Sequence, residues 1–249
     1  MKTEWDYTEL ADAYLTRPPY SEDVLNRIFS ISGLKEGADV CDVGAGVAHL
    51  TIPLAERGFR VVAVEPNDAM RANGMRRTVR FPNVSWVEAG GEETKQPDGA
   101  FDLVSFGSSF NVVDRRRALD ETHRILRPKG WFICMWNHRD LDDPIQAEIE
   151  HIIKRAIPEY GYGTRREDQS AVIRESGLFD DALPVEGAAL HVQTVAQVVE
   201  TWRSHATLHR QAGDKFSAII QSIAEYLDSL GKNDVSIPYT TRAWLARAR

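Results

Sequence analysis

The first 137 residues of the chain alternate between short apolar runs and longer amphipathic segments. Apolar runs lie at 39–43, 60–64, 84–88, 101–106 and 131–136. Within each run, apolar residues follow one another instead of alternating with polar ones, which is typical of parallel strands buried on both faces. The segments between the runs carry apolar residues at helical spacing, as over 21–29 and 115–126. This order predicts an α/β fold with a doubly wound, mostly parallel sheet.

The pattern changes after residue 137. A charged and mainly helical stretch covers 137–167, a strand is expected over 185–193, and helices are expected over 195–210 and 216–230. A last apolar run at 243–246 is predicted to be an edge strand. Because no linker rich in Pro, Gly or Ser interrupts the chain, we expect residues 1–249 to form a single domain. Its parts would be an N-terminal helical cap (1–37), a core (38–137) and C-terminal helices with the last strands (138–249).

The composition of the chain disfavours several classes of function. With 43% hydrophobic and 27% charged residues, the 249-residue chain is typical of an ordinary soluble protein. A formal net charge of −7 disfavours nucleic acid as a partner. The charged N-terminus does not resemble a signal peptide, and no apolar window is long enough to cross a membrane. Cys41 and Cys134 lie in predicted buried strands, so reduced thiols and a cytoplasmic location are expected.

A glycine-containing turn follows the first strand. Gly44 and Gly46 come directly after the run that ends at Val43, where they allow a sharp turn and close approach of the backbone to a ligand. A helix is expected immediately afterwards, and its N-terminus would offer free N–H groups. The second strand ends at Glu65, 19 residues after Gly46 (65 − 46), where a carboxylate meets a ribose diol in nucleotide-binding folds. These features predict a nucleoside cofactor.

The surrounding residues indicate which nucleoside. A dinucleotide dehydrogenase needs G-x-G-x-x-G, but here Val47, Ala48 and His49 follow the second glycine. Asp42 stands two residues before Gly44, where a carboxylate suits a cation better than a pyrophosphate. Both points favour a positively charged nucleoside without phosphate, and S-adenosylmethionine fits that description.

From about residue 8 onward the chain resembles the class I S-adenosylmethionine-dependent methyltransferases. Asp42-Val-Gly44-Ala-Gly46 is similar to their first motif, with Ala48 at the third glycine position. The segments at 64–70, 97–104 and 118–130 are similar to their later motifs. The resemblance implies a Rossmann-like, mostly parallel seven-stranded sheet with helical insertions near the C-terminus. It also implies that 38–137 binds the cofactor and that 138–249 faces the substrate.

The resemblance also implies roles for individual residues. Asp42 would act on the methionine end, Glu65 on the ribose hydroxyls, and Gly91 with Glu92 on the adenine edge, where the family commonly has Asp in place of Gly90. The full set of implied cofactor-binding residues is Tyr14, Asp42, Gly44, Ala45, Gly46, Glu65, Pro66, Met70, Gly91, Glu92, Gly107 and Ser108. For Asp42, a purely structural role in the turn is the alternative, and Tyr14 could be a packed aromatic residue instead of a cover for the cofactor.

The expected reaction is in-line methyl transfer to oxygen or nitrogen of a small molecule. A sulfonium carries an activated leaving group, so positioning can supply much of the rate and no catalytic residue is assigned. Substrate candidates, chosen by position, are Asn111, Asn137, His138, Arg203 and His205. His and Cys show no metal-ligand spacing, so no metal is expected, and the chain would act as a monomer or homodimer.

Two alternatives remain open at this point. The same cofactor could undergo a different displacement, such as cyclisation of its aminobutyryl group. The chain could also be a non-catalytic subunit that binds the cofactor.

Overall fold

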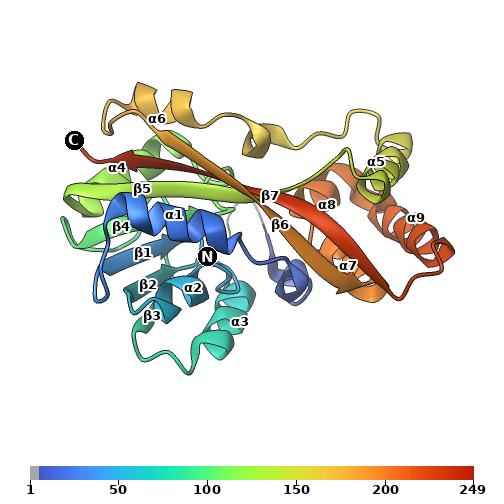
Figure 1. Cartoon of the computed structure of the whole chain (residues 1–249), viewed down its shortest axis with the longest axis horizontal. Coiled ribbons are helices and arrows are strands. Elements are labelled where there is room, and N and C mark those ends of the chain that lie inside the picture. The colour runs from blue at the N-terminus through green and yellow to red at the C-terminus, as the bar shows by residue number, and fades with distance from the viewer. Residues whose placement is uncertain (1–5) are drawn as a thin grey trace.

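The computed structural model describes residues 6–249 and contains a seven-stranded sheet in the order β3-β2-β1-β4-β5-β7-β6 (Figure 1). Neighbouring strands among β1 to β5 run parallel, while β7 is antiparallel to both β5 and β6. The strands are β1 Asp39–Val43, β2 Arg60–Val64, β3 Val84–Val87, β4 Phe101–Gly107, β5 Leu126–Arg139, β6 Leu183–Thr194 and β7 Asp234–Arg247. The predicted Rossmann-like, mostly parallel α/β fold is confirmed.

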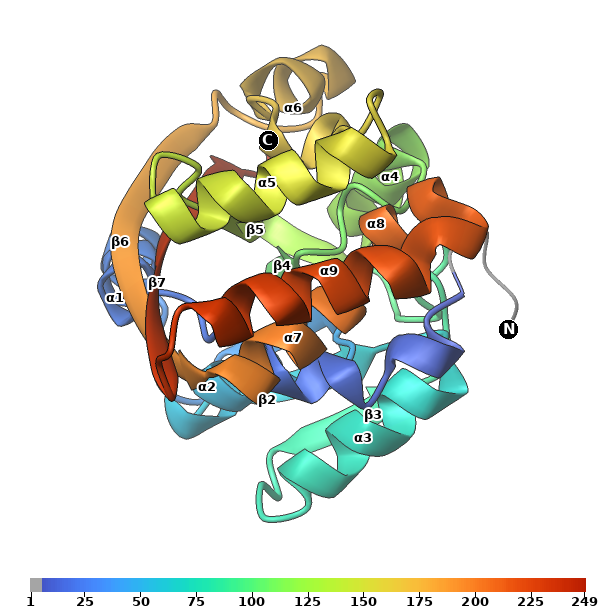
Figure 2. The same ribbon diagram turned by 90° about the vertical axis from the view of Figure 1, so that its right-hand side faces the viewer.

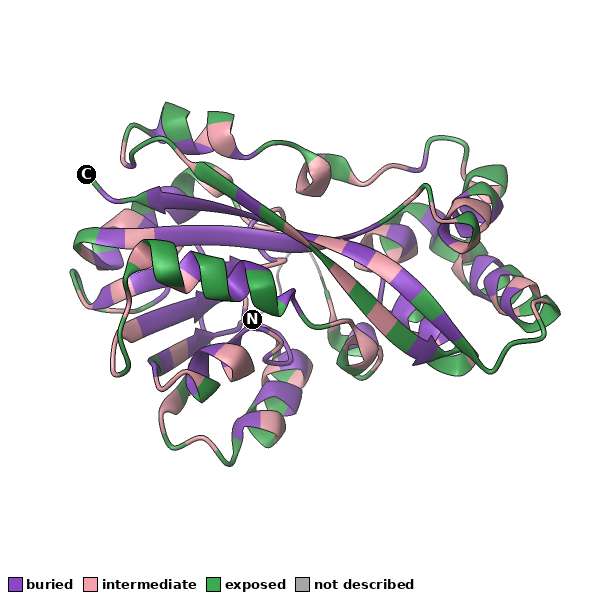
Figure 3. Ribbon diagram, in the orientation of Figure 1, coloured by how far each residue is buried: buried purple, intermediate pink, exposed green. Residues whose placement is uncertain are grey.

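Helices cover both faces of the sheet. On one face α1 (Glu22–Ser32) and α2 (Thr51–Glu56) bury Leu25, Ile28 and Leu54 against the strands. On the other face α4 (Arg115–Ile125) and α6 (Ser170–Ser176) bury Leu119 and Ile173. The strands between these layers are buried along most of their length (Figure 3), which explains why their sequences do not alternate.

A group of helices lies at one end of the sheet, where the long strands β6 and β7 extend beyond the others (Figures 1 and 2). It consists of α5 (Pro144–Ala156), α7 (Val195–Arg203), α8 (Ala206–Ala212) and α9 (Phe216–Ser229). These helices share a third apolar core with the first part of β7. The remaining elements are α3 (Asp68–Thr78) and the short 3-10 helices η1 (Thr8–Leu10), η2 (Ala13–Thr16), η3 (Gly163–Arg166) and η4 (Gly213–Lys215). Within the described residues, no helix has the length and apolar character needed to cross a bilayer.

Two predicted elements of the C-terminal part were wrong. The last apolar run is not an edge strand, because β7 pairs on both sides and β6 is the outermost strand. The helix expected over 195–210 is broken into α7 and α8 at Ser204 and His205. His205 takes a non-helical backbone conformation there, and its Nδ1 accepts the N–H of Leu208 as an N-cap.

The start of the helix after the glycine turn was also predicted wrongly, although the helix ends near Arg57 as expected. It starts only at Thr51 and has 6 residues, and residues 47–50 form turns. Gly46 and Ala48 have φ angles of 57° and 71°, which no α-helix accommodates. A helix N-terminus therefore does not follow the glycines directly, and the N–H groups of Gly44, Ala45, Gly46 and Ala48 donate to oxygens of the protein itself.

Candidate functional site

A cavity of about 650 Å³ opens at the carboxyl ends of β1, β2 and β4. The strand order reverses between β1 and β4, and such a switch point is where open α/β sheets bind ligands. All twelve predicted cofactor residues line this cavity: Tyr14, Asp42, Gly44, Ala45, Gly46, Glu65, Pro66, Met70, Gly91, Glu92, Gly107 and Ser108. The fold thus brings together residues spread over almost a hundred positions of sequence.

The glycine turn is fixed to the end of β2 by hydrogen bonds. The N–H groups of Gly44 and Ala45 both donate to the carbonyl oxygen of Val64, at 2.8 and 3.0 Å. Gly44 has a φ of 67°, and a Cβ at this position would lie 2.8 Å from Oγ of Ser109 and closer still to its Cβ. Ser109 in turn donates to the carbonyl of Val43 at 2.6 Å. Glycine is required here for both backbone and steric reasons.

Ala48, which stands at the family's third glycine position, keeps a backbone conformation that favours glycine. Its φ of 71° lies in the left-handed region that favours glycine, and its side chain is fully buried. An L-residue in this conformation costs about 1 kcal/mol. The turn therefore keeps the backbone path of a glycine motif while it carries a methyl group at this position.

Glu65 is held rigidly beside the turn. One carboxylate oxygen accepts the N–H of Gly46 at 2.9 Å and the other accepts the N–H of Asn67 at 2.8 Å. The side chain is only 6% exposed, and this burial raises its pKa. Each oxygen of a carboxylate has a further lone pair, so the group retains two acceptor positions for a pair of hydroxyls.

Asp42 lies deeper, at the end of β1. Its two oxygens accept the hydroxyl groups of Thr51 and Ser105, at 2.7 and 3.0 Å. Burial raises the pKa of Asp42 to about 6, because these two hydrogen bonds offset only part of the desolvation. The carboxylate thus both braces the turn and faces the cavity.

The N-terminal segment covers the cavity from one side. The carbonyl of Tyr14 contacts Nε2 of His49 at 2.8 Å, and the Tyr14 ring packs edge-on against Tyr7. Arg17 donates to the hydroxyl and the carbonyl of Ser204, at 2.9 and 2.8 Å. These contacts connect the start of the chain to the α7–α8 junction across the opening of the cavity.

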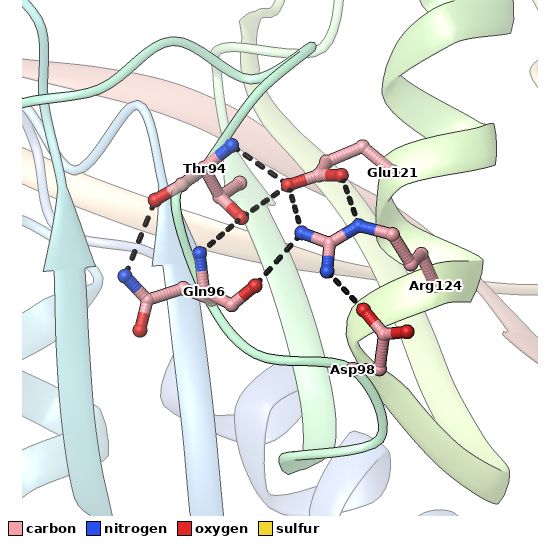
Figure 4. Close-up of polar contacts among 5 residues, drawn as sticks. All are labelled: Thr94, Gln96, Asp98, Glu121 and Arg124. Carbon is pink, nitrogen blue, oxygen red and sulfur yellow. Dashed lines mark hydrogen bonds and ion pairs between the residues drawn. The ribbon is translucent and has the colours of Figure 1, made fainter.

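The opposite wall is a loop between β3 and β4. Glu92 accepts the N–H of Asp114 at 2.7 Å, which places its carboxylate next to the start of α4. Farther along, Glu121 of α4 accepts the N–H and hydroxyl of Thr94 at 2.7 and 2.5 Å (Figure 4). Arg124 bridges Glu121, Asp98 and the carbonyl of Gln96. This network, which belongs to the segment similar to the family's later motifs, attaches the loop to α4.

The wall after β4 contains a strained residue. Ser108 has a φ of 63°, and its hydroxyl contacts that of Tyr20 at 3.0 Å. The neighbouring Gly107 leaves room for the same tyrosine, since a Cβ there would lie 3.0 Å from the Tyr20 hydroxyl. Non-glycine residues in such conformations are frequent at ligand sites.

The five predicted substrate residues separate into two groups. Asn111 and Asn137 line the cavity, where Asn111 accepts the indole N–H of Trp136 at 2.9 Å. His138, Arg203 and His205 are not among the residues that line it. Arg203 is half exposed and pairs with Glu200 on its own helix, so it points away from the cavity. His138 and His205 are buried just behind the wall.

The structure adds residues that sequence reasoning did not select. Arg17, Arg139 and Arg165 all line the cavity, and their guanidinium groups come from three distant segments. Arg17 follows η2, Arg139 ends β5 and Arg165 lies in η3, and no local pattern in the sequence connects Arg165 to the other two. Within residues 6–249 no group of three or more His, Cys, Asp or Glu side chains gathers as a metal site requires.

Known proteins agree with this arrangement. A protein family described as "Methyltransferase domain" matches residues 41–134. An uncharacterized methyltransferase of Mycobacterium tuberculosis is 33% identical over 143 residues, which cover 56% of this chain and 54% of the relative. A ubiquinone/menaquinone biosynthesis C-methyltransferase of Psychromonas ingrahamii is 28% identical over 137 residues, covering 52% and 55%. The chain spans about half the length of the curated relatives it matches.

Solved structures extend the likeness in fold to nearly the whole chain. The YcgJ protein of Bacillus subtilis superposes with a TM-score of 0.60 at 16% identity, covering 92% of this chain and 99% of the other. A Haemonchus contortus phosphoethanolamine N-methyltransferase, solved with phosphomonomethylethanolamine and S-adenosylhomocysteine, superposes with a TM-score of 0.53 at 16% identity, covering 91% and 52%. Residues 41–134, from within β1 to within β5, are thus similar to the methyltransferase domain, and the solved structures show that the fold of nearly the whole chain is also found in known methyltransferases.

Proposed function

We propose that this protein binds S-adenosylmethionine and transfers its methyl group in line to oxygen or nitrogen of a small-molecule acceptor. One observation carries the proposal. The cavity at the glycine turn and Glu65 is also lined by residues from η2, β5, β7 and α8, so an acceptor has room beside the cofactor. We further propose that residues 1–249 work as a single methyltransferase domain, with 38–137 binding the cofactor and 138–249 holding the acceptor.

The residues present fit this cofactor. Glu65 retains two acceptor positions for the ribose diol, and the apolar side chains of Pro66 and Met70 line the neighbouring wall for the adenine. Asp42 supplies a carboxylate near the methionine end, where an ammonium group suits its buried position. When bound, S-adenosylmethionine supplies a methyl group that is already activated by the positive sulfur.

The protein's own contribution would be positioning. Walls contributed by Ser108, Asn111 and Asn137 would hold the acceptor in front of the methyl group and exclude water from it. We propose an oxygen or nitrogen acceptor. A carboxylate or phenol oxygen attacks through its lone pair without a strong base, whereas an amine or alcohol needs a base to take its proton. His49, which lines the cavity, is a weak base, since burial lowers its pKa to about 4.

Calorimetry tests the cofactor site. S-adenosylhomocysteine should bind the wild-type chain with micromolar affinity, and Glu65→Ala should weaken this affinity by at least about tenfold, or ~1.4 kcal/mol. Glu56→Ala is the control, because Glu56 is exposed on α2 and pairs only with Arg80 in the described residues. Absence of binding to the wild-type protein would refute the proposed function.

Product analysis separates methyl transfer from the alternatives. Turnover with an acceptor should release S-adenosylhomocysteine, whereas cyclisation of the aminobutyryl group would release methylthioadenosine. A chain that binds the cofactor tightly but releases neither product with any acceptor would be a non-catalytic subunit.

A further inference from the structure

A group of arginines at the acceptor side of the cavity lacks carboxylate partners. Arg17, Arg139 and Arg165 line the cavity, and Arg166 lies beside them, donating to the carbonyl of Arg139 at 2.9 Å. Among residues 6–249 none of the four forms an ion pair, although most other arginines of the chain do. Arg139 is only 9% exposed. Buried charges in proteins are normally paired, so this group departs from the rule.

Aromatic rings hold these side chains in place instead. The guanidinium of Arg139 lies 4.0 Å from the centre of the Trp202 ring, that of Arg17 4.1 Å from Tyr14, and that of Arg166 4.4 Å from Tyr162. Stacking on a ring orients a guanidinium and stabilises it modestly, but it leaves the N–H donors and the net positive charge unsatisfied. The arrangement thus fixes the donors before any ligand binds.

Several of these donors have no partner. Nε of Arg139 and Nε of Arg165 are buried without a hydrogen bond, and so is the hydroxyl of Tyr239, which also lines the cavity. A buried donor that is left without an acceptor destabilises the protein, and a charged donor does so more strongly. A ligand that accepts hydrogen bonds here would remove this destabilisation.

His205 points to the type of ligand. Its Nδ1 accepts the N–H of Leu208, so the ring proton sits on Nε2. Nη1 of Arg165, which can only donate, lies 3.2 Å from that same Nε2. Two N–H donors therefore lie side by side without an acceptor, and a ligand oxygen that Arg165 binds from the cavity would relieve this contact. The ring of His205 stacks on that of Trp202, with 5.3 Å between the two ring centres, and this contact keeps it in position.

We infer that Arg139 and Arg165 bind an oxyanion of the methyl acceptor, so the acceptor is a small molecule that carries a carboxylate or a phosphate. This inference rests on the proposed function, since it concerns the acceptor side of the same cavity. The carboxylate of S-adenosylmethionine can neutralise only one cation of the group, and Arg17, on the N-terminal segment that covers the cavity, is available for it. At least one further negative charge is needed to balance Arg139 and Arg165.

Calorimetry on protein saturated with S-adenosylhomocysteine tests the inference, with succinate and inorganic phosphate as probes. At least one probe should bind with a Kd of ~1 mM or tighter, and Arg139→Gln and Arg165→Gln should each weaken it by about tenfold or more. Arg155→Gln is the control of equal charge change, on an exposed side chain that pairs with Glu148.

The outcomes separate this inference from the proposed function. If S-adenosylhomocysteine binds but neither probe does, or if the arginine variants bind the probe as the wild type does, the oxyanion site is refuted and the methyltransferase proposal stands. If a probe binds protein loaded with methylthioadenosine but is displaced by S-adenosylhomocysteine, the anion occupies the cofactor's carboxylate position, which also refutes an acceptor site. If the probes bind and S-adenosylhomocysteine does not, the proposed function fails while the anion site remains.

Discussion

At the scale of single residues, Gly44 is limited both by its backbone and by a neighbour 65 positions away in sequence. Its φ of 67° disfavours a side chain, and Ser109 fills the space that a Cβ would need. We expect Gly44→Ala to destabilise the protein by about 3 kcal/mol or more, from ~1 kcal/mol of backbone strain plus the clash. Urea unfolding at equilibrium measures this loss.

Gly99→Ala provides the matched control. Gly99 has a similar φ of 59°, but a Cβ there would meet no atom within 4 Å. Its substitution should therefore cost only the backbone strain, about 1 kcal/mol. Equal losses for the two variants would show that the contact with Ser109 does not limit position 44.

Asp42 should make cofactor binding depend on pH. Burial raises the pKa of Asp42 from 3.8 to about 6, so in the free protein the neutral form accumulates below pH 6. A cofactor whose ammonium lies near Asp42 favours the ionised form. The affinity for S-adenosylmethionine should thus fall about tenfold as the pH is lowered from 7 to 5, and calorimetry at several pH values measures it.

Adenosine serves as the comparison ligand. Adenosine has no ammonium group, so its binding should follow only Glu65, whose pKa burial also raises. If S-adenosylmethionine and adenosine show the same pH dependence, Asp42 serves only the turn. For the free protein the sign is opposite, because a raised pKa in the folded state adds stability below pH 3.8 that is lost as the pH rises towards 6.

At the scale of elements, α4 and the loop before β4 are connected by Glu121 and Arg124 (Figure 4). Glu121 is buried and accepts the N–H and hydroxyl of Thr94 as well as the guanidinium of Arg124. Glu121→Ala leaves these donors without an acceptor, so we expect a loss of about 3 kcal/mol in the free energy of unfolding. Asp120→Ala, at the preceding residue, is the control. It removes an exposed ion pair with Arg116 and should lower the free energy of unfolding by no more than ~0.5 kcal/mol.

The loss caused by Glu121→Ala should also depend on pH. Burial raises the pKa of Glu121, but the hydrogen bonds from Arg124 and Thr94 outweigh it and hold the pKa below 4.5. A lowered pKa adds stability above pH 4.5 that disappears as the pH falls through the folded-state value. Unfolding curves of variant and wild type should thus converge in acid. A difference that stays constant down to pH 3 would contradict a stabilising role for the ionised carboxylate.

The elements were predictable where local sequence determines them. The five parallel strands follow from apolar runs, of which β1 and β4 are buried along most of their length and the edge strand β3 only in part. The glycine turn follows from its own residues. The break between α7 and α8 was not predictable, because the helical spacing continues through Ser204 and the capping contact of His205 is visible only in three dimensions. The place of β7 inside the sheet depends on pairing with β5 and β6 and leaves no local pattern.

At the scale of the whole molecule, the residues at one end of the cavity were predictable from the sequence, whereas the arginines at the other end were not. The twelve predicted cofactor residues line one cavity because motifs specify them at fixed distances from strand ends. The arginines that line the cavity come from the residue after η2, from β5 and from η3, and only the packing of the C-terminal helices brings them together. Arg203 was selected because it lies on a predicted helix that was expected to cover the site. It points to solvent instead, because the sequence alone does not tell which face of α7 packs against the neighbouring helices.

The contacts that cover the cavity have a consequence for how the protein is made. Thr16 and Arg17 bind Gln193, Thr201 and Ser204, which lie 177 to 187 positions later in the chain. During synthesis from the N-terminus, β1 to β5 are complete well before these partners leave the ribosome. The nucleoside end of the cavity can therefore form during synthesis while its cover is still absent.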